Sequence, residues 1–317
     1  MSAPLPEQLN VRALLDPEVA TALAAFPLAL GTLSVETLPM IRQVGLMRPA
    51  IPLSDAVLRT DHDIAGRPGV SVRVHRPVNA AAQLPCIYWM HGGGLILGTN
   101  KGDDARFDRW CTLLNCVGVS VEYRLAPESQ YPEPLEDCYA GLAWVRDNAS
   151  SLGVDTQRIG VSGASAGAGL AAGLALLARD RGELALAFQA LIYPMLDDRL
   201  ITPSSAWDDP VWPPAANRFG WRSYLGDIKG DAVPYYAAAA RARDLTNLPK
   251  TFVSVGALDG FSDEDIDYAV RLRHAGVPTE LHVYPGAPHG FDGLAPNTAI
   301  AKRANRDIEE WLTTAMR

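Results

Sequence analysis

Short apolar runs alternate with longer segments of helical spacing from about residue 70 onward. The apolar runs predict strands at Val70–His75, Pro85–Met90, Val117–Glu122, Arg158–Val161, Phe188–Tyr193, Thr251–Val255 and Glu280–Tyr284. The helical spacing predicts helices at Ala105–Leu114, Pro134–Asn148, Ala166–Arg181, Asp263–Ala275 and Thr298–Thr314. Strands that alternate with helices form βαβ units, so we predict an α/β fold with a mostly parallel central sheet flanked by helices.

Two segments lack this alternation. Residues 1–50 have a helical pattern without a strand, and residues of about 195–240 interrupt the rhythm with aromatic residues and prolines. We predict that both lie over one end of the sheet as a helical cap. Residues 1–50 are then an N-terminal cap segment, and residues 51–317 are the main α/β domain with a cap insertion at about 195–240. The alternative is that both segments are ordinary packing helices.

The composition indicates a folded globular protein. The 317 residues are 48% apolar and carry a formal charge of −8, which leaves ample apolar surface for a large core. An acidic chain without a block of Lys or Arg repels phosphate groups, so we expect neither nucleic acid nor an anionic membrane surface as a partner. The four cysteines are too few for a disulfide framework, and we expect buried free thiols.

Neither a targeting segment nor a membrane span is visible in the sequence. The first twenty residues hold four charged side chains, Glu7, Arg12, Asp16 and Glu18, and no continuous apolar stretch. The longest apolar runs fall short of the roughly 20 residues that a transmembrane helix needs. We therefore expect a cytoplasmic protein with no stable membrane insertion, and the sequence leaves a homodimer open.

The segment Gly163–Gly167, with sequence GASAG, stands between a predicted strand and a predicted helix. A GxSxG pattern in this context is typical of a nucleophile elbow, a tight turn that needs small flanking residues and lifts the serine Oγ above the sheet. The alternative is a loop of small residues that opens a tightly packed helix. We predict that Ser165 is a nucleophile.

The motif His91–Gly94, with sequence HGGG, directly follows a predicted apolar strand. A serine that attacks an acyl carbonyl needs backbone N–H groups to stabilise the tetrahedral oxyanion, and glycines leave such groups unobstructed. We expect these N–H groups from Gly92, Gly93 and Gly94, with a further one from Ala166 at the start of the elbow helix. A phosphate-binding turn is the alternative, but no GxGxxG or GxxxxGK[ST] pattern follows.

A nucleophilic serine also needs a general base. Five of the six histidines have simpler interpretations. His75 and His282 fall within predicted strands, and His62 is expected in a polar turn. His274 lies near a helix end, and His91 is expected to brace the glycine loop. His289 instead lies in a loop directly after the last predicted strand, where the active sites of α/β proteins gather. We predict that His289 is the base.

The base in turn needs a carboxylate that orients it, and the order along the chain places this acid between the serine and the histidine. Asp259 follows the predicted strand Thr251–Val255 and ranks first. Asp263 is the runner-up. It and the next two acidic residues match the first turn of a helix, where carboxylates pair with free N–H groups, and this structural role ranks them below Asp259.

With these motifs in this order, the chain resembles the hormone-sensitive-lipase-like branch of the α/β-hydrolases, the bacterial esterases with HGGG and GxSxG motifs. The segment Tyr123–Glu128 (YRLAPE), followed by Tyr131-Pro132 and Asp137, is similar to a segment of that family. The resemblance covers about residues 85–317. It implies an eight-stranded, mostly parallel sheet, a helical cap, and hydrolysis of short-to-medium acyl esters, a small-molecule substrate, without a cofactor or metal.

The resemblance also assigns residues. It implies a catalytic triad of Ser165, His289 and Asp259. It also implies an oxyanion hole formed by Gly93, Gly94 and Ala166, with Gly92 ranked last. An apolar substrate pocket is expected from residues after the glycines and from the insertion: Leu95, Ile96, Trp207 and Trp212. Ala164 departs from the Asp or Thr that usually precedes the serine, so the subgroup stays open.

Two other functions share these features. An amidase or peptidase uses the same triad, but it needs a cleft for an extended peptide, and the sequence has no propeller or lid repeat that would build one. A catalytically silent small-molecule receptor on the same fold would be expected to lack the base histidine, and His289 is present.

Overall fold

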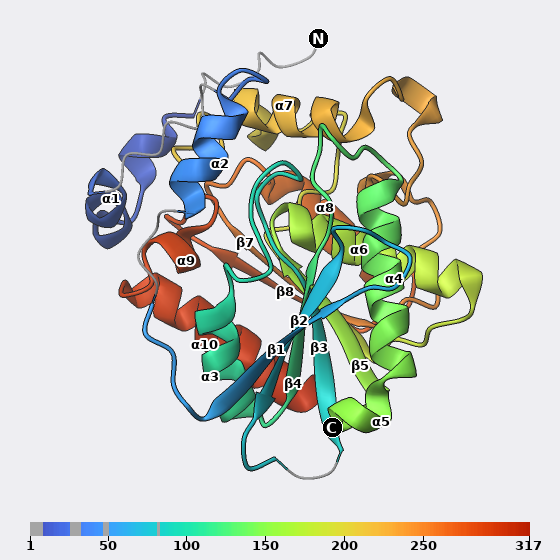
Figure 1. The fold of residues 1–317 in the computed structure, drawn as a ribbon. Coiled ribbons are helices and arrows are strands. Elements are labelled where there is room, and N and C mark those ends of the chain that lie inside the picture. The colour runs from blue at the N-terminus through green and yellow to red at the C-terminus, as the bar shows by residue number, and fades with distance from the viewer. Residues whose placement is uncertain (1–8, 26–32, 47–50, 81–82) are drawn as a thin grey trace.

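The computed structural model describes residues 9–25, 33–46, 51–80 and 83–317. Its centre is one eight-stranded sheet with the strand order β1-β2-β4-β3-β5-β6-β7-β8 (Figure 1). The strands are β1 Val57–Asp63, β2 Ser71–Pro77, β3 Leu84–Met90, β4 Val117–Glu122, β5 Val154–Ala164, β6 Phe188–Ile192, β7 Lys250–Gly256 and β8 Thr279–Tyr284. β2 pairs antiparallel with β1 and β4, and all other pairs are parallel. The predicted α/β fold with a mostly parallel sheet is confirmed.

Helices cover both faces of this sheet (Figure 1). One face packs against α3 (Asp104–Leu114) and α10 (Ala299–Ala315). Apolar residues of these helices form one buried cluster with the side chains of β3 and β6 on that face. The other face packs against α4 (Glu133–Asp147), α6 (Ala166–Arg181) and α8 (Ser262–His274), and α5 (Ala149–Leu152) follows α4. Every residue of β3 is buried, as its continuous apolar pattern requires for a strand covered on both sides.

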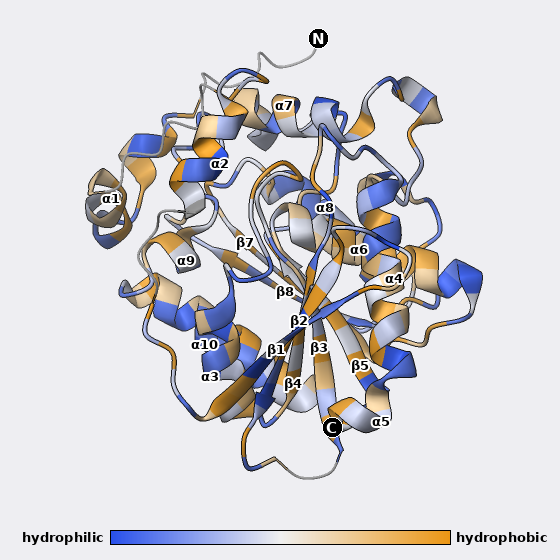
Figure 2. Ribbon diagram, in the orientation of Figure 1, coloured by the Kyte–Doolittle hydropathy of each residue, from blue (hydrophilic) through white to orange (hydrophobic). Residues whose placement is uncertain are grey.

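The edge strand β1 is absent from the sequence prediction. Of its seven residues only Val57 is buried, and Figure 2 shows it as a mostly hydrophilic strand. Such a strand has no apolar period, and it is held by its ladder with β2 and by an ion pair from Asp61 to Arg73 at 2.8 Å. The expectation that His62 lies in a polar turn is therefore wrong, because His62 pairs with Val72 within this ladder.

The helices α1, α2 and α7 of the N-terminal segment and of the insertion lie at the carboxyl end of the parallel strands (Figure 1). The N-terminal segment holds η1 Val11–Leu14, α1 Pro17–Ala24 and α2 Leu38–Leu46, and the insertion holds η3 Ser204–Ala206, α7 Pro214–Leu225, η4 Gly230–Ala232 and η5 Ala239–Arg241. Residues 1–8, 26–32 and 47–50 of the predicted cap lie outside the described residues. No helix in the part of the chain that the structure describes is long and apolar enough to cross a membrane.

Candidate active site

Ser165 occupies a tight turn between β5 and α6. Its φ of 57° and ψ of −124° lie outside the regions that a serine normally adopts, and its N–H donates to the carbonyl of Ile192 at 2.9 Å. A Cβ at Gly167 would overlap the carbonyl of Met90, so only glycine allows the helix to begin this close to β3. The strained turn and the close packing match the nucleophile elbow that the GASAG segment predicts.

The loops after β7 and β8 bring two further polar side chains to Ser165. His289 Nε2 lies 2.8 Å from Ser165 Oγ, and His289 Nδ1 lies 2.7 Å from Asp259 Oδ2. Asp259 Oδ1 also accepts the N–H of Phe261 at 2.9 Å. All three side chains of this chain of hydrogen bonds are buried. The structure thus brings together the serine, histidine and first-ranked aspartate of the sequence analysis.

The runner-up Asp263 lies elsewhere. Its Oδ2 accepts the N–H of Ser204 at 2.8 Å, and the residue belongs to the first turn of α8. A carboxylate in this place stabilises the positive end of the helix dipole, which is a structural role. The alternative of an acid at position 263 therefore has no contact with His289 to support it.

The protonation of His289 depends on opposing effects. Burial disfavours the charged imidazolium, but the carboxylate of Asp259 attracts it and accepts its hydrogen bond, and Asp209 and Asp292 add to this field. The carboxylates outweigh the burial, so the pKa of His289 is raised above its ordinary value. Nδ1 faces an acceptor and carries the proton, which leaves Nε2 of the neutral ring free to accept a proton from Ser165.

The glycine loop after β3 lies against this serine. A Cβ at Gly92 would stand 3.0 Å from the carbonyl of Ala164 and 3.4 Å from Ser165 Cβ. His91 Nδ1 donates to the Gly92 carbonyl at 2.9 Å, which is the brace expected of this histidine. The Tyr123 hydroxyl donates to the backbone carbonyl of His91 at 2.8 Å. Burial lowers the pKa of the His91 side chain, so its ring stays neutral.

The residues predicted to line a pocket fall into two groups. Leu95 and Ile96, directly after the glycine motif, are buried in the main core. From the insertion, Trp212 is buried with its indole against Gly94, where a Cβ would overlap the ring, whereas Trp207 is half-buried. Ile96 also donates its N–H to the carbonyl of Gly93 at 3.1 Å, so Ile96 and Trp212 both contact the predicted oxyanion loop.

Two aromatic rings contact His289, and neither was singled out in the sequence. Tyr193 and Phe261 meet the imidazole edge-on, each with a centroid distance of 4.9 Å. Tyr193 follows β6 directly, so its position at the carboxyl end of a parallel strand is a signal that could have found it.

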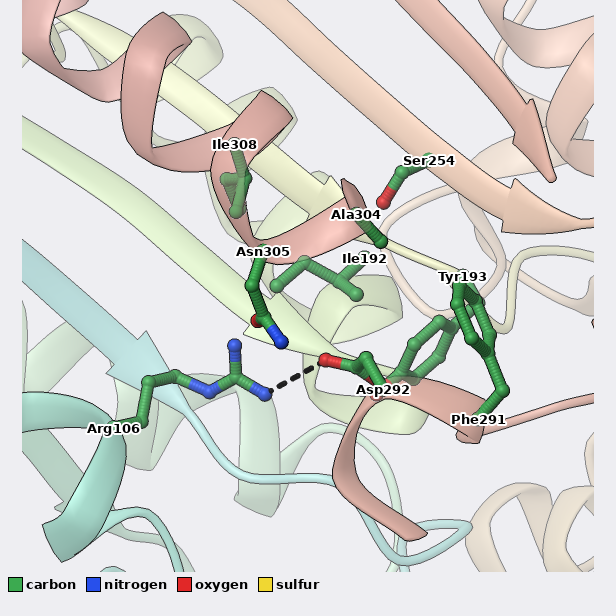
Figure 3. Close-up of a pocket in the computed structure, with 9 residues that line it drawn as sticks. All are labelled: Arg106, Ile192, Tyr193, Ser254, Phe291, Asp292, Ala304, Asn305 and Ile308. Atoms are coloured by element: carbon green, nitrogen blue, oxygen red, sulfur yellow. Dashed lines mark hydrogen bonds and ion pairs between the residues drawn. The ribbon is translucent and has the colours of Figure 1, made fainter. Parts of the chain in front are cut away.

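A buried polar network lies behind this histidine. The Tyr193 hydroxyl donates to Asp292 Oδ1 at 2.7 Å, and Arg106 pairs with Asp292 Oδ2 at 3.1 Å. Figure 3 shows Arg106 reaching from α3 toward Asp292 across a small cavity that Tyr193 also lines. Because Asp292 belongs to α9 (Phe291–Leu294), which begins two residues after His289, the network fixes the segment that carries the histidine.

No group of three or more His, Cys, Asp or Glu side chains that could hold a metal ion occurs among the described residues. All four cysteines are buried free thiols, as expected from their number. The site therefore presents a serine, a histidine, carboxylates and backbone N–H groups as its chemical equipment, which is sufficient for nucleophilic acyl transfer.

Comparison with known proteins shows the family to which this fold and this arrangement of side chains belong. Residues 87–293 match a family described as the alpha/beta hydrolase fold. The chain is 32% identical to Esterase LipI of Mycobacterium tuberculosis, over 93% of each chain. It is 33% identical to Carboxylesterase NlhH of the same organism, over 89% of this chain and 90% of the relative.

Solved structures give the same result. The bacterial heroin esterase has a TM-score of 0.89 and 38% sequence identity, covering 97% of this chain and all of that one. Esterase LipW from Mycobacterium marinum has a TM-score of 0.86 and 35% identity, covering 97% and 98%. The chain belongs to the α/β-hydrolase family and, within it, to the hormone-sensitive-lipase-like bacterial esterases.

Proposed function

We propose that this chain is a serine carboxylesterase that hydrolyses short-to-medium acyl esters through an acyl-enzyme at Ser165. The class of ester hydrolase follows from the relatives above, which are named esterase or carboxylesterase and are about one third identical over most of the chain. The residue roles are our proposal. The observation that carries them is the continuous hydrogen-bond chain from Ser165 through His289 to Asp259, at 2.8 and 2.7 Å.

In the first half of the reaction, Ser165 Oγ attacks the ester carbonyl carbon while His289 Nε2 takes the hydroxyl proton. Asp259 holds the ring in the required tautomer and stabilises the imidazolium that forms. His289 then gives the proton to the departing alkoxide, the bond from the acyl carbon to that oxygen breaks, and the acyl group stays on Ser165 as an ester.

In the second half, water attacks the acyl-enzyme with His289 again as base. The proton passes to His289 and returns to Ser165 Oγ as the acid leaves, so one water molecule is consumed and the enzyme is restored. We propose that Gly93, Gly94 and Ala166 donate to the oxyanion in both halves, because the neighbouring Gly92 of the same loop packs against Ser165 and Ala166 is the first residue of α6.

The test is a comparison of wild type with Ser165→Ala on p-nitrophenyl butyrate and on the matching anilide. We expect turnover of the ester, much weaker turnover of the anilide, labelling of Ser165 alone by a serine-directed phosphonate, and loss of both turnover and labelling in the variant. Undiminished activity of Ser165→Ala would contradict the proposal. Comparable turnover of the anilide would move the assignment to an amidase, and labelling without turnover would favour a silent receptor.

The cap, the cytoplasmic location and the homodimer belong to this proposal as predictions. A cap role for residues 1–50 and 195–240 is supported by the position of α2 and α7 at the carboxyl end of the parallel strands, and a changed acyl chain-length profile on altering the insertion tests it. Cell fractionation tests the location, and light scattering of the purified protein tests the homodimer.

A further inference from the structure

Asp209 is a buried carboxylate of the insertion, and the mechanism above does not use it. It lies between η3 and α7 and is 1% exposed. A buried carboxylate is costly unless its oxygens accept hydrogen bonds, so its partners indicate what holds it in place.

Each oxygen of Asp209 has a separate task. Oδ1 accepts the N–H groups of Val211 at 2.7 Å and Trp212 at 3.0 Å, which closes a side-chain-capped turn. Oδ2 accepts the backbone N–H of His289 at 2.9 Å, across 80 residues of sequence. One carboxylate therefore shapes a turn of the insertion and holds the backbone of the proposed base.

The turn that Asp209 closes contacts both halves of the site. On one side, the indole of Trp212 packs on Gly94 of the glycine loop, and the helix that follows comes close to the same loop, since a Cβ at Gly220 would stand 2.7 Å from the Gly94 carbonyl. On the other side, Val211 Cγ1 lies 3.9 Å from the Cβ position of Gly290, next to His289.

We propose that Asp209 is a positioning residue for the esterase reaction, which holds the backbone of His289 and the Trp212 side of the oxyanion loop at a fixed separation. The proposal rests on the proposed function, because it assigns Asp209 no step of its own. Acyl transfer requires the base and the oxyanion donors to meet one carbonyl group at the same time, so a shift of one against the other lowers the rate of the chemical step.

The charge of Asp209 adds a second effect that can be measured. The charged or titratable groups around His289 are Asp259 after β7, Asp209 in the insertion, Asp292 on α9 with its partner Arg106, and Tyr193 after β6. Asp209 is among those that raise the pKa of His289. Burial and the nearby Asp259 in turn raise the pKa of Asp209 to about 6.

The test compares Asp209→Asn with Asp208→Asn. Asp208 is the neighbouring residue with the same charge, but its side chain is 76% exposed, with an ion pair to Arg12 at 3.8 Å. Asparagine can keep the turn through its oxygen, but it presents N–H to the N–H of His289 and removes the charge. We expect kcat of Asp209→Asn to fall on the order of 10²-fold with a smaller change in KM.

The pH profile separates this role from a purely structural one. Loss of a negative charge near the imidazolium lowers the pKa of His289, so the rise of kcat/KM with pH should move to lower pH in Asp209→Asn and stay in place in Asp208→Asn. If Asp209→Asn does not fold, Asp209→Ser serves in its place, because its hydroxyl can still cap the turn but has no second oxygen for His289. A wild-type kcat and an unmoved profile in the folded variant would overturn the proposal.

Ser165→Ala, run beside these variants, keeps this proposal apart from the proposed function. An inactive Ser165→Ala together with a wild-type-like Asp209→Asn refutes only the role of Asp209. An active Ser165→Ala refutes the proposed function whatever the Asp209 variants do.

Discussion

Arg42 of α2 donates its Nε–H to the backbone carbonyl of Ile96, 2.9 Å away in the loop that follows the glycine motif. The same guanidinium donates to the carbonyl of Ala126 at 2.8 Å and forms a two-point ion pair with Glu128. A helix of the N-terminal segment is thereby fixed to two loops of the main domain. One side chain can bind these three partners at once because a planar guanidinium presents several N–H donors in fixed directions.

The first prediction concerns this contact. Arg42→Ala should lower the free energy of unfolding by about 1–3 kcal/mol, since it leaves two carbonyls without a charged donor, and kcat should fall with it. Glu128→Gln is the matched control, because it weakens only the exposed ion pair and should cost about 1 kcal/mol or less. Urea unfolding measures both, and equal effects of the two substitutions would show that the carbonyl contacts contribute nothing.

The second prediction separates the two candidate acids. Asp259→Asn should reduce kcat by about 10⁴-fold, because an amide that faces Nδ1 favours the wrong tautomer of His289. Asp263→Asn should leave kcat within a few-fold of wild type, since this side chain caps the loop at Ser204. Steady-state kinetics of both variants decides the matter, and the reverse ranking would place the orienting acid at the start of α8.

The third prediction is the pH dependence of the wild-type enzyme. A base must be neutral to accept the serine proton, and the Asp259, Asp209 and Asp292 carboxylates raise the pKa of His289 despite its burial. Activity should therefore rise with pH through a pKa above the ordinary value of about 6.5 and level off beyond it. The rate should be the same in EDTA. A kcat/KM that falls between pH 5 and 8, or a loss of rate with chelator, would contradict the assignment.

The fourth prediction concerns the contact between Gly94 and Trp212. Gly94 has a φ of 61°, and an added Cβ would overlap the indole, so Gly94→Ala should reduce kcat on the order of 10²-fold by displacing the glycine loop. Gly182→Ala is the control, with a φ of 69° and nothing within 4 Å of its Cβ position.

The overlap at Gly94 can be relieved. The double variant Gly94→Ala/Trp212→Ala removes the ring that an added Cβ would meet, although the left-handed backbone stays strained. It should therefore recover part of the lost kcat. If the activation free-energy losses of Gly94→Ala and Trp212→Ala simply add in the double variant, the two residues act independently.

The sequence determined the order of the strands from β2 onward, the helices between them and the segments that carry the chemistry. β3 is a continuous apolar run, and each of the segments GASAG, HGGG and the loop of His289 directly follows a predicted strand. These features are local, because the conformation of an elbow or of an apolar strand is encoded in neighbouring residues. Parallel topology then brings the carboxyl ends of the strands to one edge, so the site could be assembled from the sequence.

Tertiary packing decided what local pattern does not encode. The edge strand β1 has no apolar period, and Asp209, Arg42 and Tyr193 act through partners that are 80, 54 and 99 residues distant in the sequence. Two of these three contacts end on backbone atoms, which every residue possesses and which therefore leave no motif. The carboxylate of Asp209 reaches His289, and the guanidinium of Arg42 reaches the loop after the glycine motif, only because packing brings their segments over the end of the sheet.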